Sequence, residues 1–415
     1  MPMRWRDAMD RALYGPGGFF VAGAGPAGHF RTSVHASPAF ARALLRVVEH
    51  VDAALGRPSR LDVVDVGAGR GELLRTLAAL VSGSAAGPGP GEGSAVGVSG
   101  EPTRSGRSGL IPPRAGSPET LTSTAAGRPS LSAPVSGSVG PSPAAAVPLA
   151  ERVRFTAVEL APRPADLPQR IAWVHEIPSR ITGVLLATEW LDNVPLDIAM
   201  PTSDGWRYLL VDPTTGEESV GDPVGPEDAA WLETWWPVPG GHLAVEPTAG
   251  TGGASQTPTV TGVRAEIGRS RDEAWADAVG RLDRGLALAV DYGHLRDGRP
   301  VDGTLTGYRG GRQVPPVPDG SCDVTAHVAM DSVASAGARV AGCAYALGSQ
   351  REAMRALGAD GGRPPLSLAA SDPAGYVRAL AAASLVAELT DPAGLGGHWW
   401  LRQPVGVAVD ALVAR

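Results

Sequence analysis

Three glycines at alternate positions follow an apolar run and an acid in residues 61–80. The run is LDVVDV and contains Asp65, and the glycines are Gly67, Gly69 and Gly71. Glycines where a strand turns into a helix let a ligand approach the backbone and the first amides of that helix. A dinucleotide fingerprint requires its third glycine at position 72, which is Glu72 here. The spacing is therefore not that of a pyrophosphate site.

The pattern D-x-G-x-G-x-G is the form found where the ligand is a nucleoside with an amino-acid tail. Asp65 would repel a phosphate but attract an ammonium, directly or through water. The turn therefore predicts S-adenosyl-L-methionine as the cofactor in preference to NAD. The alternative interpretation is a tight structural turn that holds no ligand.

A second acid, Glu159, ends the apolar stretch TAVEL. A nucleoside site in an α/β sheet uses an acid at the end of its second strand, about 20 residues beyond the glycines, to accept ribose hydroxyls. Glu159 lies 88 positions after Gly71, and the 67 residues of 82–148 account for all but 21 of them. The spacing predicts that Glu159 binds the ribose, the alternative being a solvated charge at a strand end.

Two further acids, Glu189 and Asp192, follow an apolar run in LLATEWLDNVPL. Paired carboxylates bind the planar fork of a guanidinium bidentately and suit an amine as well. They are predicted to orient the nitrogen that accepts a methyl group and to take its proton. The alternative for Asp192 is a loop cap in which its side chain bonds to the backbone.

These residues need a scaffold, and the apolar pattern predicts one of alternating strands and helices. Helices are expected at 37–55, with Ser37 as N-cap, at 71–80 and at 271–283. The predicted strands are 61–66, 153–160, 171–176, 183–190 and 285–293. This alternation predicts an α/β fold with a doubly wound parallel sheet, whose ligand lies at the carboxyl ends of the strands.

The chain divides into five predicted regions. Residues 1–81 hold an N-terminal helical segment and the first half of the core, 149–196 continue the core, and 284–415 complete it. Residues 197–283, with a hairpin expected around 196–212, form a substrate-side cap or insertion. Residues 82–148 are rich in Gly, Ser, Pro, Ala and Thr and have no aromatic residue. Such a composition cannot bury enough apolar surface to fold, so 82–148 is predicted to be a disordered insertion. Residues 246–262 have a similar composition and are predicted to be a smaller insertion of the same kind.

Composition excludes several classes of protein. The 415 residues carry a net charge of −7, which argues against a nucleic-acid-binding or membrane-surface role. The two cysteines, Cys322 and Cys343, are too few for a disulfide framework, and the histidines lack metal-ligand spacing. No apolar run reaches membrane-spanning length. A soluble cytoplasmic protein without a metal is expected.

Seven motifs in order give the chain a specific resemblance. They are LYGPGGFF (13–20), HFRTSVHASPAFARALL (29–45), VVDVGAGRGELL (63–74), AVELAP (157–162), LLATEWLDNVPL (185–196), AVDYG (289–293) and the run from GTLTGYRGG to DVTAHVAM (303–330). Together they resemble the MidA family of S-adenosyl-L-methionine-dependent methyltransferases. The mitochondrial member of that family is a complex I assembly factor that symmetrically dimethylates a protein arginine.

The resemblance implies a class I methyltransferase fold with an added substrate-side region and a protein arginine as the acceptor. It places the family's glycine turn at 67–71, its ribose acid at Glu159 and its acceptor element at 188–195. Where the family has Pro, Glu and Asn, this sequence has Val34, His35 and Thr188. Glu189 and Asp192 are kept, so the departures affect the choice of acceptor more than the cofactor.

Other functions stay open on the sequence. A small-molecule methyltransferase would need a wide apolar pocket formed by 197–283. An assembly or interaction protein would bind S-adenosyl-L-methionine without turnover. A homodimer is compatible with the sequence, and a protein acceptor is the expected partner.

Overall fold

The strands that carry the predicted site residues lie in one seven-stranded sheet. A computed structural model describes residues 1–22, 32–83, 147–237, 262–359 and 361–408. The order across the sheet is β16-β17-β10-β5-β2-β3-β4. The bounds are β2 Leu61–Val66, β3 Val153–Val158, β4 Ile171–Val174, β5 Ile181–Thr188, β10 Leu282–Asp291, β16 Ala346–Ser349 and β17 Trp399–Val405.

The five strands from β10 to β4 are parallel, as the alternation of strands and helices predicts. The prediction of a wholly parallel sheet was wrong at the other edge, where β17 runs antiparallel to β10 and β16 antiparallel to β17. β17 is buried on both faces, with Trp400 and Leu401 at most 1% exposed. Its sequence therefore lacks the alternation that marks an ordinary antiparallel strand.

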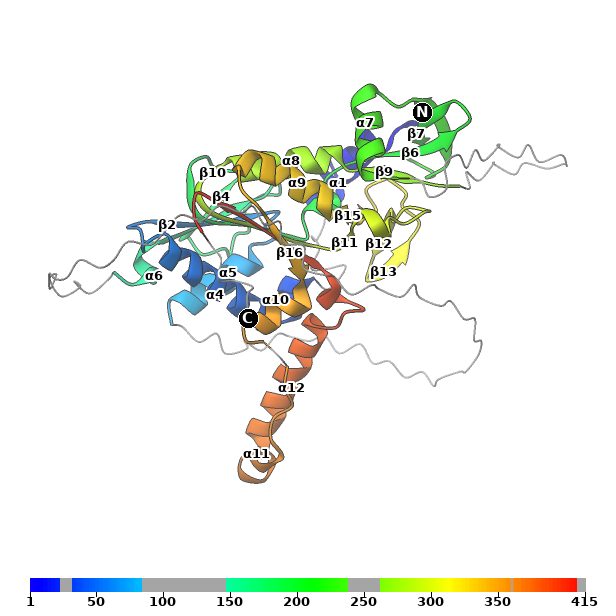
Figure 1. The fold of residues 1–415 in the computed structure, drawn as a ribbon. Helices are drawn as coiled ribbons and strands as arrows, with labels where there is room; N and C mark the ends of the chain where they lie inside the picture. The colour runs from blue at the N-terminus through cyan, green and yellow to red at the C-terminus, as the bar shows by residue number, and fades with distance from the viewer. Residues whose placement is uncertain (23–31, 84–146, 238–261, 360, 409–415) are drawn as a thin grey trace, which may run out of the picture. The chain divides into compact units, whose positions relative to one another are not determined.

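Helices cover both faces of this sheet (Figure 1). Successive residues of β2 point to opposite faces, so that Val63 packs in one apolar cluster and Val64 in the other. The first cluster contains α4 (Pro38–Ala54), α5 (Glu72–Val81) and α10 (Gln350–Ala356). The second contains α8 (Arg269–Gly280) and α9 (Met330–Ala341). This layering is that of a doubly wound α/β domain.

Helix α4 begins as its sequence predicts. The Ser37 side chain accepts a hydrogen bond from the amide of Ala39, and Pro38 occupies the first helical position. The residues Phe40, Leu44, Val47, Val48 and Val51 form its buried face. Because the cap and the apolar stripe agree, the helix is placed firmly against the sheet.

A second sheet lies in the predicted substrate-side region. Its order is β1-β7-β6-β9, with β8 also paired to β7. The bounds are β1 Met3–Arg4, β6 Asp197–Thr202, β7 Gly205–Val211, β8 Glu218–Pro223 and β9 Ala265–Ile267. β6 and β7 form the predicted hairpin. Helix α1 (Trp5–Tyr14) packs on this sheet through Trp5 and Met9, so the N-terminus belongs structurally with 197–267.

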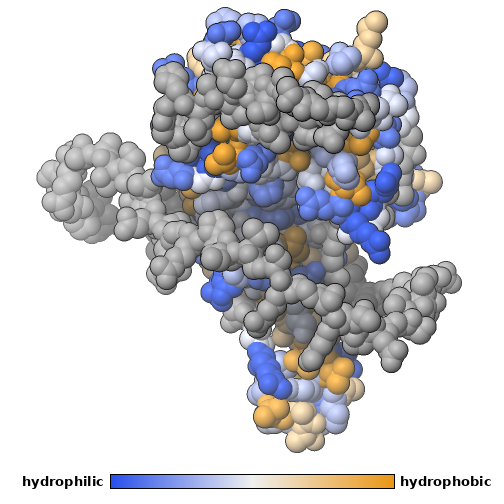
Figure 2. Space-filling model, turned by 90° about the vertical axis from the view of Figure 1, so that its right-hand side faces the viewer, coloured by the Kyte–Doolittle hydropathy of each residue, from blue (hydrophilic) through white to orange (hydrophobic). Residues whose placement is uncertain are grey.

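The remaining elements are short or peripheral. The helices are α2 Phe19–Ala22, α3 Ser33–Ala36, α6 Leu149–Arg152, α7 Pro226–Trp235, α11 Leu366–Ser371, α12 Pro373–Leu389, and the 3-10 turns η2 Leu191–Asn193, η3 Arg296–Gly298 and η4 Leu395–Gly397. The strands are β11 Gly293–His294, β12 Thr306–Arg309, β13 Arg312–Val314, β14 Asp323–Thr325 and β15 Val328–Ala329. Exposed apolar side chains gather on α11 and α12 (Figure 2), including Leu366 and Val377.

The predicted insertion at 82–148 lies outside the described residues except at its ends, and so does nearly all of 246–262. Both therefore stay predictions. Within the described part of the chain, no helix is long and apolar enough to cross a membrane.

Candidate cofactor and acceptor site

The glycine turn has the backbone that the sequence requires of it. Gly67, Gly69 and Gly71 have φ of 69°, 59° and 79°, in the region where a Cβ is strained. A Cβ on Gly67 would lie 2.8 Å from the Trp190 ring, and one on Gly71 would lie 2.7 Å from Leu167. A Cβ on Gly69 meets nothing nearer than 3.5 Å. Gly69 is therefore the point at which a ligand can approach the backbone.

The turn forms one wall of a cavity of about 620 Å³ at the carboxyl ends of the parallel strands. All seven predicted site residues except Gly71 line it. Six acids are among the described residues that line it, and Arg70, which is exposed, is the one arginine there. Those acids are Asp10, Asp65, Glu72, Glu159, Glu189 and Asp192. The cavity is therefore built for a positively charged ligand.

Asp65 is buried at 2% exposure, and its Oδ1 has no hydrogen-bond partner among the described residues. Burial raises the pKa of Asp65 to about 8, and the charges of Glu72 and Glu159 add to that shift. A buried acid without a partner is costly. An ammonium in the cavity would supply the missing partner and restore the carboxylate.

Glu159 directly follows β3 and lies beside the turn on the wall of the cavity. Its carboxylate accepts hydrogen bonds from the amides of Gly69 (3.0 Å), Leu160 (2.8 Å) and Ala161 (3.2 Å). Burial nevertheless raises the pKa of Glu159, against those three bonds. Each carboxylate oxygen can accept more than one bond, so ribose hydroxyls can still be received there. The bond to Gly69 explains why the spacing between turn and acid matters.

Glu189 follows β5 in a strained conformation, with φ of 51°. Its Oε1 accepts a hydrogen bond of 2.7 Å from the amide of Ser33 and lies 3.9 Å from Nδ1 of His398. Burial raises the pKa of Glu189 to about 7, and it lowers the pKa of His398 to about 4. The imidazole is therefore neutral at pH 7 and does not balance the carboxylate. Strain of this kind is concentrated at functional sites.

Asp192 lies one turn further, in η2, at 3% exposure. Its Oδ2 accepts hydrogen bonds from the hydroxyls of Tyr292 and Thr325, the latter at 2.8 Å. Its Oδ1 has no partner among the described residues. Burial raises the pKa of Asp192. Two side-chain hydroxyls hold one oxygen and the other has no such partner, although the backbone amide of Asn193 also acts to lower the pKa of this carboxyl, as in the loop-cap alternative.

Asp291, at the end of β10, also caps this loop. Its Oδ2 accepts hydrogen bonds from the amides of Leu191 (3.0 Å) and Asp192 (3.3 Å). Beneath the same loop lies Arg271 of α8, which is 1% exposed. Its guanidinium donates to the carbonyls of Asp192, Val194, Ala326 and His327. These two groups fix the backbone that carries Asp192.

Sequence reasoning did not identify Tyr292, Thr325, His398 or Arg271 as part of the site. Tyr292 and Thr325 lie in two of the motifs that carry the family resemblance, AVDYG and DVTAHVAM. Their place in these motifs could have identified them as candidate site residues. Arg271 stands in an ordinary amphipathic helix and gives no such signal.

The segment that departs from the family pattern also lines the cavity. Nδ1 of His35 lies 2.7 Å from the Thr32 hydroxyl, and its Nε2 lies 3.4 Å from Glu72 Oε1. Opposite, Tyr14 donates a hydrogen bond of 3.2 Å to the carbonyl of Asn193 and stacks on Phe20. Tyr14, Phe20 and His35 thus line the cavity.

Comparison with known proteins bears on the cofactor and on the fold. Residues 146–348 match a family described as "Putative S-adenosyl-L-methionine-dependent methyltransferase". The match covers just under half of the chain and includes Glu159, Glu189 and Asp192. No curated protein matches the sequence. The family match confirms the predicted cofactor, S-adenosyl-L-methionine, and the matched family is one of methyltransferases.

Two solved structures from Burkholderia thailandensis share the fold at 21% identity. One is described as a likely methyl transferase bound to S-adenosyl-homocysteine; it has a TM-score of 0.65 and covers 98% of this chain and 89% of its own. The other, described as an uncharacterized protein of the same superfamily, has a TM-score of 0.63 and covers 99% and 90%. The similarity extends beyond the family match to the glycine turn and to α12.

Proposed function

We propose that the protein transfers methyl groups from S-adenosyl-L-methionine to an arginine side chain of another protein, as a member of the MidA family with a class I methyltransferase fold. The strand order supports the fold. Numbered in chain order, the parallel strands β4-β3-β2-β5-β10 are the third, second, first, fourth and fifth, and the antiparallel β17 lies between β10 and β16. The cavity lies where the order reverses, which is where this class of sheet binds ligands.

The residues present fit the cofactor. Gly69 leaves room for close approach, Asp65 carries an unpartnered oxygen for the ammonium, and Glu159 lies beside the turn for the ribose. When bound, the cofactor supplies an electrophilic methyl group on a sulfonium. The surplus of acids on the wall stabilises that positive charge.

The observation that carries the acceptor is the unpartnered Oδ1 of Asp192 beside the buried Glu189. A guanidinium placed between the two carboxylates would satisfy both. As its nitrogen bonds to the methyl carbon, the carbon–sulfur bond breaks and the sulfur becomes a neutral thioether. The nitrogen's proton passes to one of the two carboxylates, and both have pKa values raised toward neutrality by burial.

Titration calorimetry with S-adenosyl-L-methionine, using NAD as the control, tests the first half of this proposal. Binding near micromolar affinity, about −8 kcal/mol, is expected for the methionine derivative and none for NAD. Transfer of radioactive methyl groups to arginine-containing peptides tests the second half. A protein that binds the cofactor but methylates only small amines would contradict the protein acceptor, and one without any turnover would be an interaction protein.

Cofactor affinity is expected to rise with pH up to about 8. Asp65, with a pKa of about 8, must lose its proton before it can pair with the ammonium, so affinity gains up to about tenfold per pH unit below that value. The Asp65→Asn variant should bind more weakly and lose most of this dependence. Calorimetry at pH 6, 7 and 8 measures the affinity and its change with pH. An equal pH dependence in the native protein and in the variant would exclude Asp65 as the titrating group.

Asp65 should have the opposite effect on the pH dependence of stability. Its pKa is raised on folding, so between about pH 4 and 8 the folded state holds a proton that the unfolded state has lost. The free energy of unfolding without cofactor should therefore fall as the pH rises through this range. Asp65→Asn should flatten that fall, which thermal unfolding at each pH would show.

A further inference from the structure

A second cavity, of about 900 Å³, adjoins the cofactor cavity. Four residues line both: Asp10 of α1, Val194 and Pro195 after η2, and Ala274 of α8. The two cavities therefore adjoin at the loop that follows Asp192. We call the second one the outer groove.

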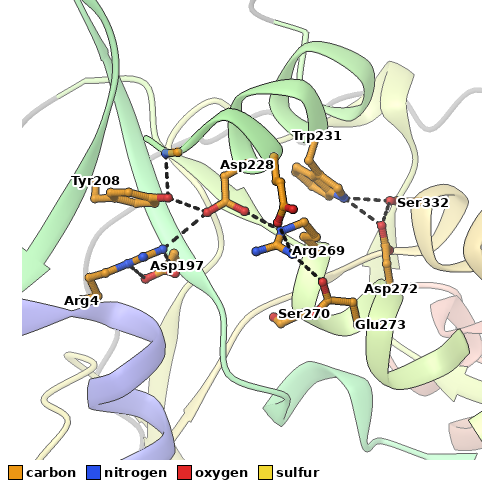
Figure 3. Close-up of polar contacts among 12 residues, drawn as sticks. Arg4, Asp197, Tyr208, Asp228, Trp231, Arg269, Ser270, Asp272, Glu273 and Ser332 are labelled. Atoms are coloured by element: carbon orange, nitrogen blue, oxygen red, sulfur yellow. Dashed lines mark hydrogen bonds and ion pairs between the residues drawn. The ribbon is translucent and has the colours of Figure 1, made fainter. Parts of the chain in front are cut away.

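The floor of the outer groove is a closed network of charges (Figure 3). Arg4 pairs with Asp197 through two nitrogens and lies 3.8 Å from the centre of the Tyr208 ring. Asp228 accepts bonds from the hydroxyl of Tyr208 (2.6 Å) and from Arg269 (2.7 Å). Asp197 and Asp228 are buried, at 4% and 6% exposure. The floor is thus satisfied internally and rigid.

The wall of the groove carries charges that this network does not use. Asp7 and Asp10 are three positions apart on α1 and so share a face. Both are exposed and line the groove, and no hydrogen bond or ion pair joins either side chain to another described residue. Among the groove's described lining residues, six carboxylates face three arginines. The spare charge is negative, and Asp10 marks the entrance to the cofactor cavity.

We propose that the outer groove binds the acceptor protein as an extended segment with a lysine or arginine beside the arginine that is methylated. The flanking cation pairs with Asp7 and Asp10, while the target side chain passes Val194 and Pro195 to reach Asp192. The inner end of this path is the unpartnered Oδ1 of Asp192, buried at 3% exposure, which itself calls for a cationic ligand. The inference rests on the proposed function and adds the class of sequence that is recognised.

The test is equilibrium binding of two fluorescein-labelled peptides in the presence of S-adenosyl-homocysteine. Both have nine residues and a central arginine among glycines and alanines; one has lysines two positions to either side, and the other has glutamates there. The lysine peptide is expected to bind at least tenfold tighter, with a preference that weakens at high salt. Equal binding of the two peptides, or no binding of either, would overturn the inference.

Variants locate the effect. Asp7→Asn and Asp10→Asn together should weaken binding of the lysine peptide about fivefold to tenfold, because each exposed pair contributes a few-fold. Glu49→Gln, on the exposed face of α4 and outside both cavities, is the matched control and should change nothing. Asp7→Lys should improve binding of the glutamate peptide and so reduce the ratio between the affinities of the two peptides. A merely structural role for Asp7 does not predict this.

Methyl transfer to the same peptides is measured separately, so that the two proposals can fail independently. Tight, Asp7-dependent binding of the lysine peptide without methylation would support the groove and contradict the arginine acceptor. Methylation of both peptides at equal rates and affinities would support the acceptor and contradict the groove.

Discussion

Replacing Asp192 by asparagine is expected to reduce methyl transfer by about a hundredfold to ten-thousandfold, the range in which positioned acids and bases contribute to catalysis. The change keeps the volume of the side chain. Its remaining oxygen can still accept hydrogen bonds from Tyr292 and Thr325, which hold Oδ2 in the native protein. An NH2 group then replaces the unpartnered Oδ1. The guanidinium of the substrate and this NH2 group are both hydrogen-bond donors, so they cannot pair.

Cofactor binding should survive this substitution within about threefold, because Asp65, Glu159 and the glycine turn hold the cofactor on the far side of the cavity. The measurement is kcat with an arginine-containing acceptor peptide, together with calorimetry for S-adenosyl-L-methionine. An interaction protein would show no change in its partner contacts, whereas an enzyme should lose turnover alone. Full turnover in Asp192→Asn would mean that Glu189 accepts the proton of the methylated nitrogen. The loss of turnover would then be expected in Glu189→Gln.

Thr325→Val provides the graded control for this argument. It removes the 2.8 Å hydrogen bond to Asp192 and leaves both carboxylates in place. We expect a loss of turnover of about tenfold or somewhat more, between the native protein and Asp192→Asn, since one hydrogen bond to a charged group contributes about 1.5–3 kcal/mol. A positioning role also predicts a shifted pH profile, which a general loss of stability does not.

The sheet and the cofactor wall were predictable because their signals are local. The apolar run 61–66 is buried on both faces, so continuous hydrophobicity identified it as a central strand. The glycines after it have positive φ, which a side chain would strain, and the acid after the next strand reaches back to the amide of Gly69. Removing 82–148 from the count was enough to bring Glu159 into register with the turn.

The acceptor wall was predictable only in part, because its partners come from distant segments. Asp192 was found from its own motif, but the hydroxyls that hold it belong to residues 100 and 133 positions later. The outer groove joins Arg4 to Asp197 and Asp228 across 193 and 224 positions. No pattern of period 2 or 3.6 encodes such pairs, since they arise from packing of elements already formed. The antiparallel β17 was missed for the same reason.

Arg271→Met is expected to lower the free energy of unfolding by about 3–5 kcal/mol, the largest effect on stability among the changes considered. The side chain is 1% exposed and lies beneath the loop between β5 and β6. Its nitrogens lie 3.1, 3.0 and 2.9 Å from the carbonyls of Val194, Ala326 and His327, and it also donates to the carbonyl of Asp192. Methionine fills the space but removes the donor of the Val194, Ala326 and His327 carbonyls, whereas the Asp192 carbonyl keeps a bond from the amide of Ala326.

Arg281→Met is the matched control, because Arg281 directly follows α8 and pairs with Asp277 at 3.0 Å while staying 41% exposed. An exposed pair of this kind contributes less than about 1 kcal/mol, so this variant should unfold almost like the native protein. Denaturant titration compares the two. Equal stability of both variants would mean that the three carbonyls find other donors.

Arg271→Met should also affect the acceptor side of the site more than the cofactor side. Arg271 also places one positive charge under Asp192, Glu266 and Asp291, and its loss leaves those buried acids without a counter-charge. The loop between η2 and β6 lines both cavities, so its disorder would reach the acceptor path before the glycine turn. At a temperature where Arg271→Met is still folded, turnover should therefore fall more than cofactor affinity. A proportional loss of both would show that α8 supports the cofactor wall as well.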